Sequence, residues 1–216
     1  MEFRGVMGGL FRISEWITRL AYINILWIFF SIVGFLVIGF FPSTVAMFTV
    51  MRKLVMREVD IPIFMTFWLT FKKELVKSNI LGYIVSTLGI VLYINITFLQ
   101  HSDTNISFLL IPNMMIALLF LLTILYVFPV YVHYEYSIMA VLKNSLLLMI
   151  IHPIATMSMI IGSFTILIAL NVLPAFSFFF SGSGFALLFT AISLWVFDRI
   201  LQKKQVETIK LSDAQN

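Results

Sequence analysis

The chain has 216 residues, of which 61% are hydrophobic and 11% are charged, and its formal net charge is +4. Its mean hydropathy of +1.06 lies far above the range of soluble domains, so the composition excludes a soluble globular protein. The absence of cysteine excludes disulfides, thiolate metal sites and cysteine nucleophiles. We expect no nucleic-acid partner for such a chain.

Long apolar runs determine the fold class. A bilayer core about 30 Å thick is crossed by roughly 20 apolar residues in a helix, and runs of this kind occupy most of the sequence. The runs are apolar on all sides, whereas the strands of a membrane β-barrel alternate apolar and polar positions. The sequence therefore predicts an all-α, polytopic membrane protein with a single integral membrane domain over residues 1–216.

The first expected element is an amphipathic helix over residues 1–18, which mixes apolar side chains such as Phe11 and Trp16 with basic ones such as Arg12. Such a mixture is typical of a helix that lies in the membrane interface. The apolar run that follows, residues 20–41, is long enough to span the bilayer. It is also longer than the apolar region of a cleaved signal peptide, so we expect this terminus to be retained.

The stretch IGFFPSTVAMFTVMRKLV then interrupts the apolar region with a proline and two small polar residues. Basic segments flank residues 20–51 on both sides, and basic segments mark the cytoplasmic side of a membrane. We therefore predict a helical hairpin over residues 20–57. Its turn is formed by Pro42, Ser43 and Thr44, with Pro42 as the first residue of the returning helix, where a missing N–H costs no hydrogen bond.

The returning segment, residues 42–56, would form about 22 Å of helix, which is short for a full crossing. It either spans a thinned bilayer, spans with its basic side chains snorkelling, or only dips into the membrane. All three arrangements keep both flanks in the cytoplasm. The alternative is a single crossing by residues 20–41, which would place six basic residues outside.

Residues 58–77 include PIFMTFWLTFKKELVK, where Phe64, Trp68 and Phe71 recur at helical spacing. We predict a second interfacial helix here, and the alternative is a solvated connecting helix that packs on the bundle. Residues 78–198 are expected to hold four spans, and residues 199–216 a polar tail. The expected spans are 80–99, 108–132, 146–173 and 175–197. The last is interrupted by SGSG, either within the helix or in its outer loop.

The distribution of basic residues gives the expected orientation. Six lie in residues 52–77, one in the connection at Lys143 and four in the tail, whereas the connections 101–107 and 171–175 contain none. By the positive-inside rule both termini are cytoplasmic, in a bacterial cell membrane. The charges that set this topology are Arg52, Lys53, Arg57, Lys72, Lys73 and Lys77.

Four stretches carry a family resemblance: GGLFRISEWITRLAYINILWIF, IGFFPSTVAMFTVMRKLV, FMTFWLTFKKELVKSNILGY and YSIMAVLKNSLLLMIIHP. They resemble the YesL-like family of small bacterial integral membrane proteins in nearly the whole chain, although Lys-Glu-Leu at 73–75 replaces a more basic run. The resemblance implies a protein of a Gram-positive bacterium that is encoded beside carbohydrate uptake and polysaccharide-degradation systems. It implies no established activity.

Residues that could carry chemistry are few. All ten acidic residues fall in loops or at the ends of apolar runs, so coupling to protons or sodium through a buried carboxylate is not expected. No metal-ligand spacing or phosphate-binding loop is present, and we expect neither enzymatic activity nor a cofactor.

His152 is the most distinctive polar residue, because it lies within an apolar run and precedes Pro153. It forms either a polar path with Thr156 and Ser158 or, as the pattern favours, an interhelical hydrogen bond. Asn24 and Asn95 also favour interhelical hydrogen bonding. The candidates for a polar path or for helix packing are His152, Pro153, Thr156, Asn24 and Asn95.

The functional hypothesis is a non-enzymatic accessory protein for oligosaccharide uptake or its regulation, which packs against permease subunits in the bilayer. The alternative is a small transporter or channel for a neutral solute, acting as a homo-oligomer, because neutral sugars require no buried charge. A membrane enzyme is a third, less favoured hypothesis, because the sequence shows no catalytic arrangement of residues. A permease subunit itself is not favoured, because the inner connection VHYEYSIMAVLKN is short and lacks glycine.

Overall fold

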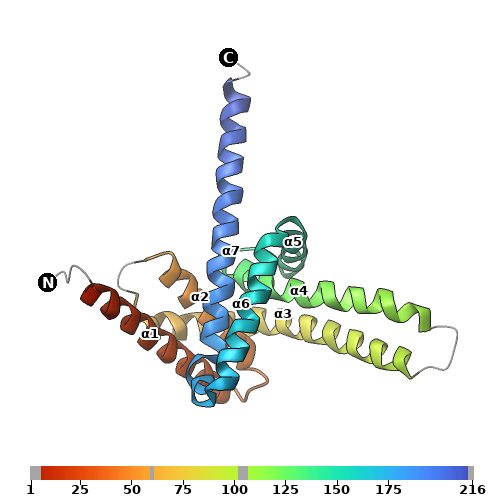
Figure 1. Ribbon diagram of the computed structural model, residues 1–216, viewed down its shortest axis with the longest axis horizontal. Helices are drawn as coiled ribbons and strands as arrows, with labels where there is room; N and C mark the ends of the chain where they lie inside the picture. Colours follow the sequence, from red (N-terminus) through yellow and green to blue (C-terminus); the bar gives the residue numbers. More distant parts are fainter. Residues whose placement is uncertain (1–5, 59–60, 102–106, 214–216) are drawn as a thin grey trace.

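The computed structural model describes residues 6–58, 61–101 and 107–213 (Figure 1). Parts of the predicted segments 1–18, 58–77, 101–107 and 199–216 lie outside these ranges. The described residues form helices and turns without a strand, which confirms the all-α class. The elements are α1 (Val6–Val33), α2 (Phe40–Val55), α3 (Ile63–Gln100), the short 3-10 helix η1 (Ser107–Leu109), α4 (Leu110–His133), α5 (Ile138–Ile151), α6 (Pro153–Val172) and α7 (Pro174–Asp213).

Within the described ranges, five helices are long and apolar enough to cross a membrane: α1, α3, α4, α6 and α7. The protein is therefore a polytopic membrane protein whose outer faces contact the lipid bilayer. In Figure 1 the α3 and α4 helices lie side by side and project away from the rest, and α6 runs beside α7. The two helix pairs are joined through α2 and the end of α4.

The short helix α2 is the centre of the fold. It packs against α1, α3, α4 and α7, and ten of its 16 residues are buried. A helix of this length spans about 24 Å, less than the bilayer core. Because protein surrounds α2 on most sides, its length does not have to match the lipid. The predicted hairpin of residues 20–57 is present, and Trp27 of α1 donates from Nε1 to the Thr44 hydroxyl of α2 at 3.1 Å.

The turn of this hairpin lies elsewhere than predicted. It is formed by residues 34–39, and α2 begins at Phe40, two residues before Pro42. Pro42, Ser43 and Thr44 are therefore buried residues near the start of α2 and do not form the turn of the hairpin. The position remains favourable for proline, since the first N–H groups of a helix have no intrahelical partner. The two glycines of the turn bring the chain close to itself: a Cβ on Gly39 would lie 2.7 Å from the Cα of Gly34.

The predicted interfacial segments continue directly into the spans that follow them. α1 is helical from Val6, and α3 is one helix of 38 residues without a break near residue 78. Phe67 and Phe71 of α3 are buried against Phe30 of α1, with ring centroids 5.2 and 5.1 Å apart. The aromatic side of residues 63–77 therefore packs on the bundle, as in the alternative considered for this segment.

The run 146–173 was predicted as one span, and this is wrong. α5 ends at Ile151, α6 begins at Pro153, and His152 between them has a non-helical backbone (φ −117°, ψ 64°). Proline lacks the N–H that would continue the first helix, and its ring disfavours helical geometry at the residue before it. In Figure 1 the helix α5 is seen nearly end-on, whereas α4 and α6 are seen from the side. The axis of α5 is therefore steeply inclined to the axes of α4 and α6. The SGSG sequence, by contrast, lies inside the continuous helix α7.

Candidate functional site

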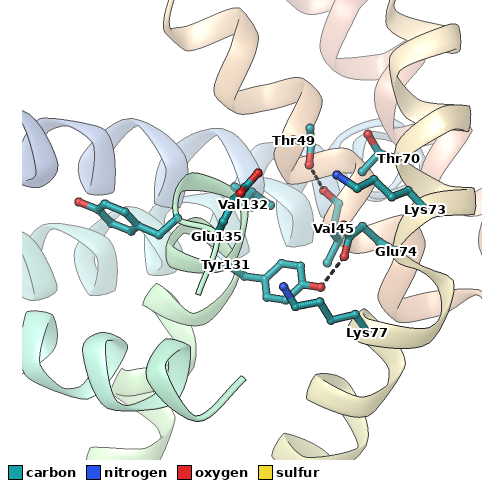
Figure 2. Close-up of a pocket in the computed structure, with 10 residues that line it drawn as sticks. Val45, Thr49, Thr70, Lys73, Glu74, Lys77, Tyr131, Val132 and Glu135 are labelled. Atoms are coloured by element: carbon teal, nitrogen blue, oxygen red, sulfur yellow. Dashed lines mark hydrogen bonds between the residues drawn. The ribbon is translucent and has the colours of Figure 1, made fainter. Parts of the chain in front are cut away.

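A cavity of about 570 Å³ lies where α2, α3 and the end of α4 meet (Figure 2). The residues that line it are mostly polar or charged. They are Val45, Thr49, Thr70, Lys73, Glu74, Lys77, Tyr131, Val132, Tyr134 and Glu135.

Helical spacing explains how α3 supplies one wall. Thr70, Lys73, Glu74 and Lys77 occupy positions i, i+3, i+4 and i+7, which share one face of a helix. Val45 and Thr49 of α2 are four residues apart and form a second wall. Each wall is therefore a continuous stripe on a regular helix, which fixes the positions of its side chains.

The third wall forms because α4 ends at this level. The helix stops at His133, and Tyr134 is extended (φ −117°, ψ 139°), which lets Tyr134 and Glu135 turn toward the cavity. Burial, followed by the nearby Tyr136, raises the pKa of Tyr134. Arg52 of α2 reaches behind this wall and donates from Nη1 to the Val132 carbonyl oxygen at 3.2 Å, which holds the end of α4 against α2.

One hydrogen bond joins two walls directly. The hydroxyl of Tyr131 donates to Oε2 of Glu74 at 2.5 Å, and the Lys77 ammonium lies 5.2 Å from the centroid of the Tyr131 ring. In Figure 2 the Lys73 ammonium, the Thr49 hydroxyl and the Glu135 carboxylate face the same space. The lining thus combines ammonium donors with carboxylate acceptors.

The formal charges of the lining cancel, because Lys73 and Lys77 are matched by Glu74 and Glu135. The Thr49 and Thr70 hydroxyls donate to carbonyl oxygens of their own helices, each at 2.8 Å. Each hydroxyl oxygen can still accept a hydrogen bond. The cavity can therefore hold a neutral, hydrogen-bonding molecule without leaving a net charge beside it.

Comparison with known proteins identifies relatives over most of the chain. The uncharacterized protein YesL of Bacillus subtilis is 37% identical over 207 residues, which cover 96% of this chain and 98% of YesL. The uncharacterized protein YteU of the same organism is 36% identical over 183 residues, covering 85% of this chain and 82% of YteU. A family described as "Protein of unknown function, DUF624" matches residues 20–96. The chain belongs to the YesL-like DUF624 family. The resemblance inferred from its sequence is thereby confirmed, and no solved structure matches the chain at a significant level.

The DUF624 match covers two of the three cavity walls. Residues 20–96 include α2 and the cavity-lining part of α3, whereas Tyr131 and Glu135 lie beyond its end. The α4 wall lies outside the matched region, although the similarity to YesL extends over 96% of the chain. The Tyr131–Glu74 and Arg52–Val132 hydrogen bonds link the end of α4 to the matched region.

The six charges that were predicted to set the topology have different surroundings in this DUF624 protein. Lys73 and Lys77 line the cavity, and Arg52 supports its wall. The remaining three lie outside it. Lys53 is 3.7 Å from Glu58, Lys72 stacks 4.0 Å above the Trp68 ring, and Arg57 follows α2 in the left-handed backbone region (φ 57°).

The five candidate residues for a polar path are not brought together. Asn24 is buried between α1 and α7, where its Nδ2 donates to the Phe178 carbonyl at 2.7 Å. Its Oδ1 accepts from the Gly182 and Ser183 backbone N–H groups at 2.9 and 3.0 Å. Asn95 is exposed on α3, and the described part of the chain shows no hydrogen bond for it.

Thr156 belongs to a separate network at the start of α6. Its hydroxyl lies 3.0 Å from the Tyr126 hydroxyl and 3.2 Å from the carbonyl oxygens of Met149 and His152. The Ser158 hydroxyl donates back to Ile154 of its own helix. The His152 ring and Pro153 instead line a second, smaller cavity beside α7.

The sequence-based reasoning missed the cavity residues Thr49, Thr70, Glu74, Tyr131 and Glu135. The spacing of Thr70, Lys73, Glu74 and Lys77 was a visible signal of a polar helical face. Nothing in the sequence indicated that the end of α4 would close over that face.

Proposed function

We propose that this protein is a non-enzymatic accessory component of oligosaccharide uptake or its regulation, and that it binds a neutral polyhydroxylated solute in the cavity between α2, α3 and α4. The observation that carries the proposal is the charge-balanced polar lining, with Lys73 and Lys77 opposed by Glu74 and Glu135. The link to carbohydrate uptake itself rests on the family resemblance.

The size and chemistry of the cavity support a sugar-like ligand. Its volume of about 570 Å³ falls within the range of small-molecule sites. Sugar hydroxyls both donate and accept hydrogen bonds, so they can use ammonium and carboxylate groups together. Tyr131 and Tyr134 add ring surface for the apolar face of a sugar. An ionic ligand would gain no net attraction from such a lining.

The accessory role is supported by the surface of the α3–α4 pair. α3 is the least buried of the candidate spans, with 11% of its apolar window inside the protein. Exposed side chains such as Tyr93, Ile111 and Met115 continue this apolar surface on both helices. Lipid covers such a surface, and a permease subunit could equally pack on it.

The proposed orientation places the cavity at the cytoplasmic side, with both termini in the cytoplasm. Support comes from the basic residues, because Arg52, Lys73 and Lys77 gather at the cavity end of α2 and α3. A ligand would then reach the site from inside the cell. This arrangement suits a protein that reports on or assists uptake already under way.

The test is calorimetric titration of the purified full chain in nanodiscs with a panel of neutral oligosaccharides. We expect binding of at least one neutral saccharide, weakened about tenfold or more in Lys73→Gln and Glu135→Gln, since each loses a charge-assisted hydrogen bond. The matched control Lys72→Gln changes the adjacent charge outside the cavity and should bind normally. Equal affinity in all four proteins, or no binding to any saccharide, would contradict the proposal.

The transporter alternative is favoured by the break at His152–Pro153, since broken helices line the sites of many transporters. Reconstituted liposomes decide between the two roles. Saccharide flux that is abolished by His152→Ala would establish a transporter. Absence of flux together with co-purification of an uptake permease would support the accessory role.

A further inference from the structure

A second cavity, of about 150 Å³, lies where α6 begins beside α7. It shares no lining residue with the cavity between α2, α3 and α4. The junction of α5 and α6 supplies one side and α7 the other. The lining residues are Ile151, His152, Pro153, Ile154, Ala155, Trp195, Arg199, Ile200 and Lys203. We refer to it as the basic groove.

Two cations on one face of α7 dominate the basic groove. Trp195, Arg199 and Lys203 are spaced four residues apart, which places them along one side of the helix. The Arg199 guanidinium carbon lies 3.9 Å from the centroid of the Trp195 ring, and this cation–π contact holds it at the groove. Among the described residues no carboxylate forms an ion pair with Arg199 or Lys203. The groove lining itself contains no acidic residue.

The surroundings of His152 show the same excess of positive charge. Burial lowers the pKa of His152, and Lys203 and Arg199 lower it further by repulsion. The beginning of α6 adds to this field, because Pro153 occupies its first turn and the N-terminal end of a helix is electropositive. All of these contributions favour an anion in the groove.

The rim of the basic groove is apolar. Ile151 and Ile154 are 63% and 77% exposed, and they stand beside the cations. The groove also lies at the ends of two candidate spans, Pro153–Val172 and Pro174–Lys203, which is the level where lipid headgroups meet the protein. Cations next to exposed aliphatic side chains at this level match a molecule that has both an anionic head and an apolar tail.

We propose that the basic groove binds the phosphate group of an anionic phospholipid, with Arg199 and Lys203 contacting the phosphate oxygens and the exposed isoleucines contacting the acyl chains. The volume of about 150 Å³ suits a headgroup phosphate, while the tails lie outside along Ile151 and Ile154. Arginine offers two parallel N–H donors to one phosphate, and lysine adds a point charge.

The experiment measures lipid affinity of the full chain in mild detergent by native mass spectrometry with added phosphatidylglycerol. Each basic side chain near an anionic lipid contributes a factor of about five. Lys203→Gln should therefore weaken binding about fivefold, and Arg199→Gln/Lys203→Gln about 25-fold. The control Arg12→Gln/Lys72→Gln removes the same total charge elsewhere, including a lysine stacked on a tryptophan, and should retain wild-type affinity.

Two further arms separate the possible sources of phosphate. Phosphatidylcholine with the same acyl chains should bind at least tenfold more weakly than phosphatidylglycerol, because its headgroup is neutral overall. Inorganic phosphate alone should neither compete with phosphatidylglycerol nor raise the melting temperature. Competition by inorganic phosphate at equal strength would overturn the lipid assignment, and so would wild-type lipid affinity in the double variant. Lys203 is exposed at the surface of α7, so its single substitution tests the groove without disturbing the fold.

Discussion

The two hairpins of this protein, α1–α2 and α3–α4, both consist of apolar helices, but their surroundings differ most between α2 and the projecting part of the α3–α4 pair. α2 is enclosed by four other helices and buries ten of its 16 residues. The α3–α4 pair projects from the bundle and exposes most of its apolar surface (Figure 1). The enclosed helix α2 is less apolar on average than α3 or α4, which project into lipid, and it is not among the five candidate spans. The difference should appear when matched substitutions are made in each hairpin.

The largest difference is expected for matched methionines. Met51 of α2 is 0% exposed and Met115 of α4 is 62% exposed. Met51→Ala should lower the free energy of unfolding by about 4 kcal/mol, because it leaves a cavity in a packed core. Met115→Ala should change it by less than about 0.5 kcal/mol. Steric-trapping measurements in bicelles would show this. Similar losses for both variants would mean that α2 is not the core of the fold.

Matched glycines give the next largest difference. A Cβ at Gly39 would lie 2.7–2.8 Å from backbone atoms of Phe30, Ser31 and Gly34, and backbone atoms cannot rotate away. Gly39→Ala should therefore cost about 3 kcal/mol and open the α1–α2 turn. The control Gly89→Ala in α3 meets only the Phe120 ring at 3.4 Å. Its melting temperature in detergent should equal or slightly exceed that of the wild type.

Matched asparagines should differ by a smaller amount. Asn24→Ala removes three hydrogen bonds to α7 and should cost about 1.5 kcal/mol, near the upper end measured for polar contacts between membrane helices. Asn95→Ala, on the exposed side of α3, should have no measurable effect. Chemical denaturation of the two variants in the same micelle gives the comparison. An equal cost at both positions would show that Asn95 has a partner outside this chain.

Cysteine labelling sharpens the comparison without changing stability, since the chain has no native cysteine. Val37 lies exposed in the α1–α2 turn, and Met56 lies exposed just after α2. With both termini cytoplasmic, an impermeant thiol reagent on intact cells should label Val37→Cys and leave Met56→Cys unlabelled. Labelling of Met56→Cys alone would indicate the single crossing. No labelling of Val37→Cys before or after permeabilisation would indicate a hairpin that only dips into the bilayer.

Much of this architecture was predictable because it follows from one-dimensional patterns. Apolar runs gave the membrane class, and the basic residues on both sides of residues 20–51 gave the first hairpin. The position of its turn was not predictable, since Pro42 is a strong local signal whereas the approach of Gly34 to Gly39 exists only in the folded chain. Pro153 was a visible signal for a break in the run 146–173. The run was nevertheless predicted as one span, because hydropathy does not show that the helix changes direction within an apolar run.

The candidate site was predictable only in part. Lys73 and Lys77 were assigned by their charge to the membrane boundary, and the spacing from Thr70 to Lys77 places them on one face. Tyr131 and Glu135, which line the same cavity, are more than 50 residues away in the sequence, and they reach the cavity because α4 ends at His133. Contacts of this kind depend on how helices pack, which no local pattern specifies.

The Asn24 contact has a consequence for the biogenesis of the protein. Its amide lies on α1, which leaves the ribosome before α7, and its partners Phe178, Gly182 and Ser183 follow 154 to 159 residues later. During synthesis Asn24 must remain without these partners in the membrane until α7 has been inserted. A chain that stops before α7 therefore exposes a polar amide to lipid, which is the kind of signal that membrane proteases and insertion chaperones can recognise. The side chain that joins α1 to α7 thus distinguishes a chain in which α7 has been inserted from one in which it has not.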